Sequence, residues 1–384
     1  MKLRNCQLGD VIKLQRGHDL PERVRQVGEI PVVTSSGITG FHNEAKAKAP
    51  GVVTGRYGTL GEVFYLEKDY WPHNTALYVV DFKDTHPRFA SYFLRNVLRN
   101  FQSDKAAVPG IDRNVLHALD VRVPIGSAQE TIASTLSAYD EQMENNRRRM
   151  GLLEKAARLL YEEWFVRLRF PGHEHTAIIH GLPQGWRSLA LGRITTKVGS
   201  GATPRGGSSA YMSEGITLIR SLNVYDDQFE DAGLAFISDE QASDLENVTV
   251  QSRDILLNIT GASVARCCMA PDRYLPARVN QHVMIIRVDP IKADPFLVHA
   301  AINSDERKRQ LLSYAQKGST REALTKEMIN AFEVTLPSDS LMREYGDIAR
   351  TCFLQRENLA LQNQKLRAAR DLLLPRLMSG ELEV

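Results

Sequence analysis

Residues 129–168, QETIASTLSAYDEQMENNRRRMGLLEKAARLLYEEWFVRL, decide the fold of this chain. The stretch has no proline and a seven-residue repeat of mainly apolar positions, which is typical of a coiled-coil helix. At 1.5 Å per residue, roughly 40 residues form a rod of about 60 Å. A lone amphipathic rod cannot bury its apolar stripe, so the pattern predicts a partner helix. The two seam positions are Ile132, Tyr139, Asn146, Leu153 and Leu160, and Leu136, Met143, Met150, Ala157 and Trp164.

The predicted partner lies near the C-terminus, in residues 342–374. One seam repeats there every seven residues, whereas we expect the complementary seam to pass through Gln355 and Gln362, where apolar residues are usual. Both helices follow a proline, Pro124 and Pro337, at an offset of about 213 residues. A long repeat of this kind indicates an internal duplication. The repeating seam residues are Tyr345, Cys352, Leu359, Leu366 and Leu373.

The segments before the two helices are similar to each other. Residues 191–194 repeat 8–11, 216–221 repeat 30–35, 254–258 repeat the strand at 51, and 280–282 align with 74–76. The pattern predicts an α+β protein with two mixed α/β domains, two long antiparallel coiled-coil helices and a pseudo-twofold relation. The expected parts are a first domain (1–127), first helix (128–170), linker (171–186), second domain (187–338), and second helix with tail (339–384).

Composition places the chain in an ordinary class. Its 384 residues are 43% hydrophobic and 24% charged, with no apolar run long enough for a membrane span. The N-terminus does not resemble a signal peptide, and the four cysteines have neither zinc-site nor disulfide spacing, so we expect a cytoplasmic protein. A net charge of +2 neither requires nor excludes nucleic acid.

Several local strings carry a family resemblance. They are Trp164-Phe165-Val166, Phe170-Pro171, LPQGW at 182–186 and LLPRLMSGE at 373–381, in the order domain, helix, domain, helix. In this order the whole chain resembles the specificity subunit of type I restriction-modification systems. It departs from that pattern in lacking a Leu-Pro-x-Gly-Trp string before Leu8.

The resemblance implies that each globular domain is a target recognition domain that reads one half of a bipartite DNA site. Because the two domains differ in sequence, the two half-sites should differ too. The helices would set the half-site spacing and dock two methyltransferase subunits, and restriction subunits can join. The resemblance implies no cofactor on this chain, with S-adenosylmethionine, ATP and Mg²⁺ on the partner subunits.

Candidate DNA-contacting residues come from polar loops, since base edges and phosphates are read by amides, hydroxyls, imidazoles and guanidinium groups. For any single residue the alternative is a turn or a solvated surface group. In the first domain the candidates are Thr34, Ser35, Ser36, Arg56, Tyr57, Thr59, His73, Asn74 and Lys105. In the second domain they are Lys197, Ser200, Thr203, Arg205, Arg220, Asn223, Asn258, Thr260, Asn280, Gln281, His282, Lys317, Ser319 and Arg321.

Other interpretations of the sequence stay open. Trp164, Phe165, Leu373 and Leu377 are candidates for a partner interface, with core packing as the alternative for Trp164 and Phe165. Asn146 either sets helix register or faces solvent. The chain has no Walker, Gly-x-Gly-x-x-Gly, Gly-x-Ser-x-Gly or Asn-Pro-Pro-Tyr motif, so we expect no catalysis by the chain itself. The alternative functions are a scaffold that binds no DNA and a nuclease with an unrecognised metal site.

Overall fold

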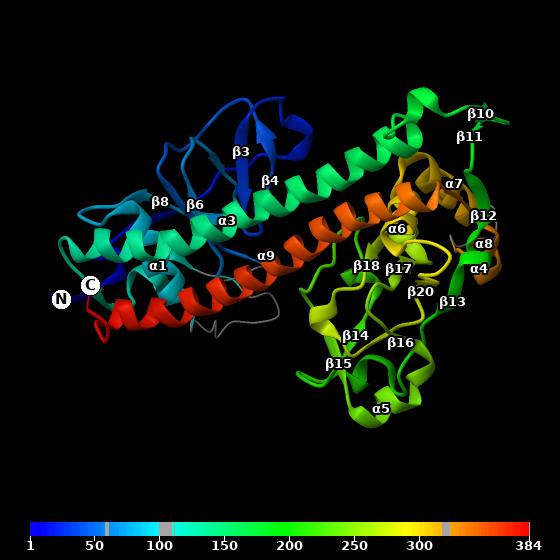
Figure 1. Ribbon diagram of the computed structural model, residues 1–384. Coiled ribbons are helices and arrows are strands. Elements are labelled where there is room, and N and C mark those ends of the chain that lie inside the picture. The colour runs from blue at the N-terminus through cyan, green and yellow to red at the C-terminus, as the bar shows by residue number, and fades with distance from the viewer. Residues whose placement is uncertain (58–60, 100–109, 111, 317–322, 384) are drawn as a thin grey trace. The chain divides into compact units, whose positions relative to one another are not determined.

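The computed structural model describes residues 1–57, 61–99, 110, 112–316 and 323–383. The chain divides into two compact units: residues 1–146 with 362–384 form the first, and residues 147–361 form the second. Two long helices, α3 (Ala128–Tyr161) and α9 (Asp339–Ser379), each contribute one part to both units (Figure 1).

The first unit is built on three small sheets. A four-stranded antiparallel sheet has the order β2-β8-β5-β6, and a three-stranded sheet has the order β4-β3-β7 with β3 parallel to β7. The third sheet pairs β1 with β9. The strands are β1 (Leu3–Gln7), β2 (Lys13–Arg16), β3 (Ile30–Thr34), β4 (Gly37–His42), β5 (Gly51–Gly55), β6 (Val63–Leu66), β7 (Trp71–Pro72), β8 (Ala76–Asp81) and β9 (Asp120–Pro124).

The second unit repeats this plan. Its four-stranded antiparallel sheet has the order β13-β20-β17-β18, its second sheet has the order β15-β14-β19-β16, and β12 pairs with β21. A short hairpin, β10 (Ile178–Ile179) and β11 (Leu182–Pro183), precedes them. The other strands are β12 (Arg187–Ala190), β13 (Thr195–Ser200), β14 (Ile216–Ile219), β15 (Ala235–Ile237), β16 (Thr249–Val250), β17 (Ile255–Asn258), β18 (Cys267–Met269), β19 (Ala277–Val279), β20 (Val283–Val288) and β21 (Glu333–Leu336).

The matching strand orders bear out the predicted α+β fold and internal duplication. In each unit a proline-initiated helix, α1 (Pro87–Leu98) or α6 (Pro295–Asn303), packs on the four-stranded sheet. Proline suits the first helical position because its missing N–H would be unpaired there in any case. The remaining helices are α2 (Arg113–His117), α4 (Leu191–Ile194), α5 (Asp239–Asp244), α7 (Asp305–Gln316) and α8 (Lys326–Ala331).

Within each unit the two long helices pair in antiparallel fashion, as predicted. In the first unit Asn146 bonds Asn363 and Asp140 pairs with Arg370, while in the second unit Glu154 pairs with Arg356. α3 ends at Tyr161 and passes into a π-helical turn over Glu162–Val166. No described helix is both long and apolar enough to cross a membrane.

The complementary seam of α9 differs from the prediction. Gln355 and Gln362 are exposed, and the buried seam lies one residue further along. In the sequence this seam resembles a solvent-exposed helix face, because three of its members are polar. In the structure these three polar side chains bond to side chains of α3. The members of the seam are Ala349, Arg356, Asn363, Arg370 and Leu377.

Candidate nucleic-acid interface

In the first unit, several predicted residues meet at the turn 73–75 between β7 and β8. The backbone N–H of His73 donates to the Val33 carbonyl at 2.8 Å, and the N–H of Arg56 donates to the Thr75 carbonyl at 2.9 Å. The Ser35 N–H donates to Thr75 Oγ1 at 3.4 Å. The turn therefore joins the ends of β3, β5 and β8. Thr75 is central to this junction. It was not among the predicted contact residues, because a single hydroxyl forms no recognisable sequence pattern.

Arg56 and Tyr57 form the exposed edge of this cluster. The guanidinium carbon of Arg56 lies 4.5 Å from the Tyr57 ring centroid, and the Tyr57 residue is 40% exposed. An arginine held over an aromatic ring offers one group for phosphate and one for base stacking. Burial, with a smaller effect of Arg25, lowers the pKa of His73, so its imidazole is neutral near pH 7 and can both donate and accept.

The second unit builds the same turn with different side chains. The N–H of Asn280 donates to the Ile219 carbonyl, and the N–H of Ile259 donates to the His282 carbonyl, each at 3.0 Å. These bonds match those of His73 and Arg56, so residues 280–282 correspond to 73–75. The predicted alignment with 74–76 was wrong by one residue, because short strands leave a one-residue shift undetected in sequence.

Polar side chains gather on this second turn. Thr260 Oγ1 and His282 Nδ1 are 2.7 Å apart, and Gln281 Nε2 lies 3.1 Å from His282 Nε2. Gln281 is exposed, whereas Asn280 is buried and its Oδ1 accepts from the His282 N–H at 3.2 Å. An exposed glutamine has the paired donor and acceptor that adenine recognition in the major groove requires.

A glycine fixes each turn against the neighbouring chain. A Cβ at Gly17 would lie 2.1 Å from the His73 carbonyl oxygen, and a Cβ at Gly201 would lie 2.1 Å from the Val279 carbonyl oxygen. Neither approach tolerates a side chain, since both obstacles are backbone atoms. The two units thus share a rigid frame whose side chains differ, which is the arrangement expected of two readers of unlike ligands.

Two predicted contact residues are fully buried, and the prediction for them was wrong. Asn223 and Asn258 have no exposed surface. Asn223 Nδ2 donates to the Glu230 carbonyl at 2.9 Å, and Asn258 Nδ2 donates to the Ser221 carbonyl at 2.8 Å. Both amides satisfy backbone carbonyls of the loop after β14, so they position this loop and cannot touch DNA in this structure.

The other candidates are more scattered. Lys197 lies opposite Arg287, near the end of β20 remote from the turn, and its ammonium bonds the Asn247 carbonyl. Arg220 directly follows β14 but is held by the Gly233 carbonyl and the Tyr211 ring. Exposed Ser36, Thr203 and Arg205 lie on loops, exposed Ser200 ends β13, half-buried Thr34 ends β3, and Asn74 bonds Asp19. The predicted residues outside the described part of the chain are Thr59, Lys105, Lys317, Ser319 and Arg321.

Comparison with known proteins shows which family part of the chain matches. Residues 2–155 match the family model described as the type I restriction modification DNA specificity domain. A curated relative, the type I restriction enzyme MjaIX specificity subunit of Methanocaldococcus jannaschii, is 24% identical over 291 residues. The chain is thus similar to a type I restriction-modification specificity subunit. The match covers 73% of this chain and 65% of the relative, so the chain spans less than two thirds of the relative's length.

One solved structure shows the same fold. The type I restriction-modification S subunit from M. genitalium has a TM-score of 0.61 and 15% identity, and the match covers 98% of this chain and 96% of that chain. The HsdS subunit from Thermoanaerobacter tengcongensis has a TM-score of 0.35 and 16% identity, with 99% and 97% of the two chains covered. The first likeness supports the α+β fold of this chain.

The predicted partner-interface residues pack in or against the chain's own cores, which favours the core-packing alternative for Trp164 and Phe165. Trp164 is buried and Phe165 packs between Tyr345 and Trp186, while Leu377 is buried and Leu373 packs against the core of the first unit. Aromatic side chains at helix ends were ambiguous between interface and core in the sequence.

The exposed apolar positions of the helices lie elsewhere. Leu152 is 66% exposed, Leu159 and Val166 follow it at seven-residue intervals, and Leu354 and Leu361 are exposed on the second-unit part of α9. The seven-residue spacing outside the seam could have revealed this stripe in the sequence.

Among the described residues, no group of three or more His, Cys, Asp or Glu is placed to hold a metal ion.

Proposed function

We propose that this chain is the DNA sequence-specificity subunit of a type I restriction-modification complex, in which each unit reads one half of an asymmetric bipartite site. One observation carries the proposal: both units present a polar turn at the same end of equivalent sheets, and the side chains differ. His73-Asn74-Thr75 in the first unit stands where Asn280-Gln281-His282 stands in the second. A shared frame with unlike side chains predicts unlike half-sites.

Each turn offers both kinds of group that DNA recognition needs. In the first unit, Arg56 supplies a cation for a phosphate, and Tyr57 beside it supplies a ring. In the second unit, Gln281 supplies a bidentate amide for a base edge. Under this proposal the phosphate contacts give affinity and register, and the base contacts give sequence preference.

The long helices are proposed to set the half-site spacing and to dock partner subunits. Exposed Leu152, Leu159 and Val166 form an apolar row on α3 and the turn after it, which suits an amphipathic helix of another chain. We propose two methyltransferase partners, one for each copy of the duplicated plan, with restriction subunits able to join. Chemistry, and with it S-adenosylmethionine, ATP and Mg²⁺, would reside on these partners.

The test is selection from a library of random duplexes by the chain co-purified with its methyltransferase partner, at two salt concentrations. The proposal predicts recovered sites with two unlike specified blocks at a constant separation, and weaker total binding at higher salt. Salt-sensitive binding without a preferred sequence, or no binding, would leave the scaffold interpretation in its place.

A further inference from the structure

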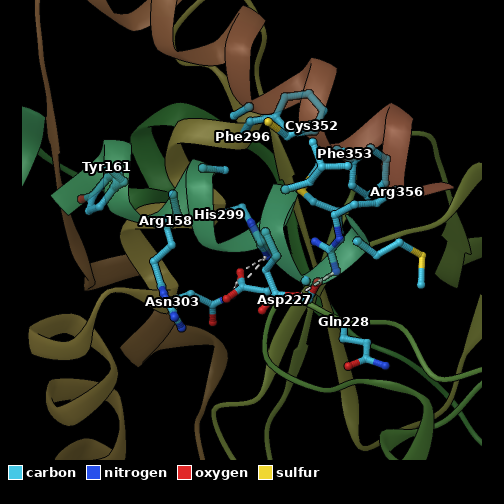
Figure 2. A pocket seen from close by; sticks show the side chains of 18 of the residues that line it. Arg158, Tyr161, Asp227, Gln228, Phe296, His299, Asn303, Cys352, Phe353 and Arg356 are labelled. Carbon is cyan, nitrogen blue, oxygen red and sulfur yellow. Dashed lines mark hydrogen bonds and ion pairs between the residues drawn. The ribbon is translucent and has the colours of Figure 1, made fainter. Parts of the chain in front are cut away.

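The second unit contains a cavity of about 350 Å³ that the DNA-reading role does not use. Its walls come from α3, α9, α6 and the loop after β14, all within residues 147–361. Figure 2 shows its interior, where Asp227 faces His299 and Asn303 while Arg356 reaches toward the same loop from α9. Four alanines line the cavity, and three of them, Ala157, Ala300 and Ala349, have larger counterparts in the first unit.

The duplication shows what fills the equivalent space in the first unit. α6 and α1 both begin at a proline, which maps Ala300 onto Tyr92. The offset of about 213 residues between the long helices maps Ala157 onto Arg370 and Ala349 onto Leu136. The first unit therefore carries a much larger side chain at each of these three positions. The cavity of the second unit lies where these larger side chains are replaced by alanine.

In the first unit the filling groups form a bonded set. The Tyr92 hydroxyl donates to Asp140 Oδ2 at 2.6 Å, and the Arg370 guanidinium pairs with the other oxygen of the same carboxylate. Tyr92 is buried and Arg370 largely so. The phenol of Tyr92 and the guanidinium of Arg370 thus fill the space in the first unit that corresponds to the cavity of the second unit.

The cavity wall suits an aromatic ligand. Phe296, Tyr345 and Phe353 line it and belong to or pack against one apolar core. Aromatic faces bind both flat rings and cations, because the ring quadrupole presents negative potential at its face. A cavity of this size accommodates a single-ring molecule with a short side chain.

The mostly buried charges of the wall favour a cation. Glu357 pairs with Arg273, and Glu154 pairs with Arg356 at 3.1 Å, so these four groups balance. Arg147, Arg158 and Asp305 also line the cavity but are exposed, and Glu162 is half-buried. Among the mostly buried carboxylates this leaves Asp227, whose side chain is 17% exposed. Its Oδ1 accepts from Asn303 Nδ2 at 2.8 Å and lies 3.6 Å from His299 Nε2.

Burial, reinforced by Arg356 and Lys308, lowers the pKa of His299, so His299 does not neutralise Asp227 near pH 7. Lys308 lies outside the cavity lining and pairs with Asp226. The cavity wall therefore carries one unbalanced buried carboxylate, which a ligand cation would neutralise.

Two arginines of the cavity lining also have buried hydrogen-bond donors without an acceptor. The Nε atoms of Arg273 and Arg356, two lining residues, are buried and have no hydrogen-bond partner among the described residues. A buried donor without an acceptor costs about 1–3 kcal/mol. A ligand hydroxyl can accept from such a donor.

We propose that this cavity binds a small aromatic cation: a single ring with a hydroxyl group and a short arm ending in an ammonium or amidinium group. The ring replaces Tyr92 and the cation replaces Arg370 of the first unit, with Asp227 as the counter-charge. This site is separate from the DNA-reading turns, and its test does not depend on DNA binding.

The experiment titrates the full-length chain with tyramine by calorimetry, with p-cresol as the matched probe that keeps the phenol and lacks the cation. The expected result is one tyramine per chain, bound about tenfold more tightly than p-cresol. Ala300→Tyr, which restores the first unit's residue, should abolish tyramine binding, whereas Lys155→Gln, at an exposed position of α3 outside the lining, should leave it unchanged. Circular dichroism melting establishes that each variant is folded.

A second filling variant keeps the test decisive if Ala300→Tyr does not fold. Ala349→Leu restores the first unit's residue from α9 and should also abolish binding. The proposal is overturned if the wild-type chain binds neither probe, if tyramine binds no more tightly than p-cresol, or if the folded filling variants bind tyramine as the wild type does.

Discussion

Asn146 and Asn363 are joined inside the seam of the first unit: Asn146 Nδ2 donates to Asn363 Oδ1 at 2.9 Å, and Asn146 has no exposed surface. Asn363 Nδ2 in turn donates to the Met143 carbonyl at 3.1 Å. A buried asparagine pair is satisfied only when the two helices are in this register, so the pair specifies the alignment of α3 with α9.

Asn146→Ala should lower the free energy of unfolding by about 1–3 kcal/mol, because it leaves Asn363 Oδ1 without its donor in a buried position. The double replacement of Asn146 and Asn363 by Leu should recover most of this loss, since no buried polar group remains. Urea unfolding of the wild type, both single variants and the double variant measures the coupling. Additive losses in the double variant would show that the pair does not act as a unit.

Tyr92→Phe should lower the free energy of unfolding by about 1–2 kcal/mol, because the Asp140 carboxylate loses the phenolic donor it holds at 2.6 Å. Tyr65→Phe is the matched control, since it removes a phenolic hydroxyl from half-buried Tyr65 on β6 of the same unit. Chemical denaturation compares the two variants, and an equal effect of both would contradict a special role for the Tyr92 hydroxyl.

The sequence predicted burial correctly where the heptad spacing and the apolar residue type agree. Ile132, Leu136 and Met143 are buried as the heptad predicts, because apolar residues at seam positions have one way to leave water. The duplication was visible as well, because prolines and short strand motifs recur in order. These features come from local periodicity, which a single sequence displays directly.

Tertiary partners explain what the sequence did not reveal. Arg356, Asn363 and Arg370 look like surface residues, yet each is held in the seam by a group on α3. Asn258 looked like a DNA-contacting amide, but its Nδ2 satisfies carbonyls of a loop about thirty residues away in sequence. Only the folded chain brings such partners together, so burial of polar groups was the main source of error.

Stability should fall in mild acid in a way that depends on His299. Burial is the main cause of its lowered pKa in the folded chain, so below about 6.5 the unfolded state binds more protons than the folded state. Folding free energy is therefore lost as pH falls through that value.

His299→Gln removes this proton-binding difference and should flatten the dependence of stability on pH. Urea unfolding at pH 8 and pH 5.5 measures it for both proteins. His73 and His117 also have lowered pKa values, but they are present in both proteins, so the comparison isolates His299. If the stability of the two proteins depended on pH in the same way, the loss of stability in mild acid could not be assigned to His299.

Leu152→Lys combined with Leu159→Lys should weaken association with the proposed methyltransferase partner by at least about tenfold, because two exposed apolar anchors are replaced by charges. The stability of the isolated chain should change by less than about 0.5 kcal/mol, since both side chains are exposed. Analytical ultracentrifugation of the mixed subunits measures association. Lys155→Glu, an exposed charge change on the same helix, is the control, and it should leave assembly intact.

The most direct test of two independent readers is duplex selection with Arg56→Ala and Gln281→Ala, each assembled with the partner subunits. Gln281→Ala should relax preference in one block by about 1–3 kcal/mol per base contacted, and leave the other block unchanged. Arg56→Ala should weaken binding through the first unit without altering the block that depends on Gln281. Loss of preference in both blocks from Gln281→Ala, or in neither, would contradict the assignment of one half-site to each unit.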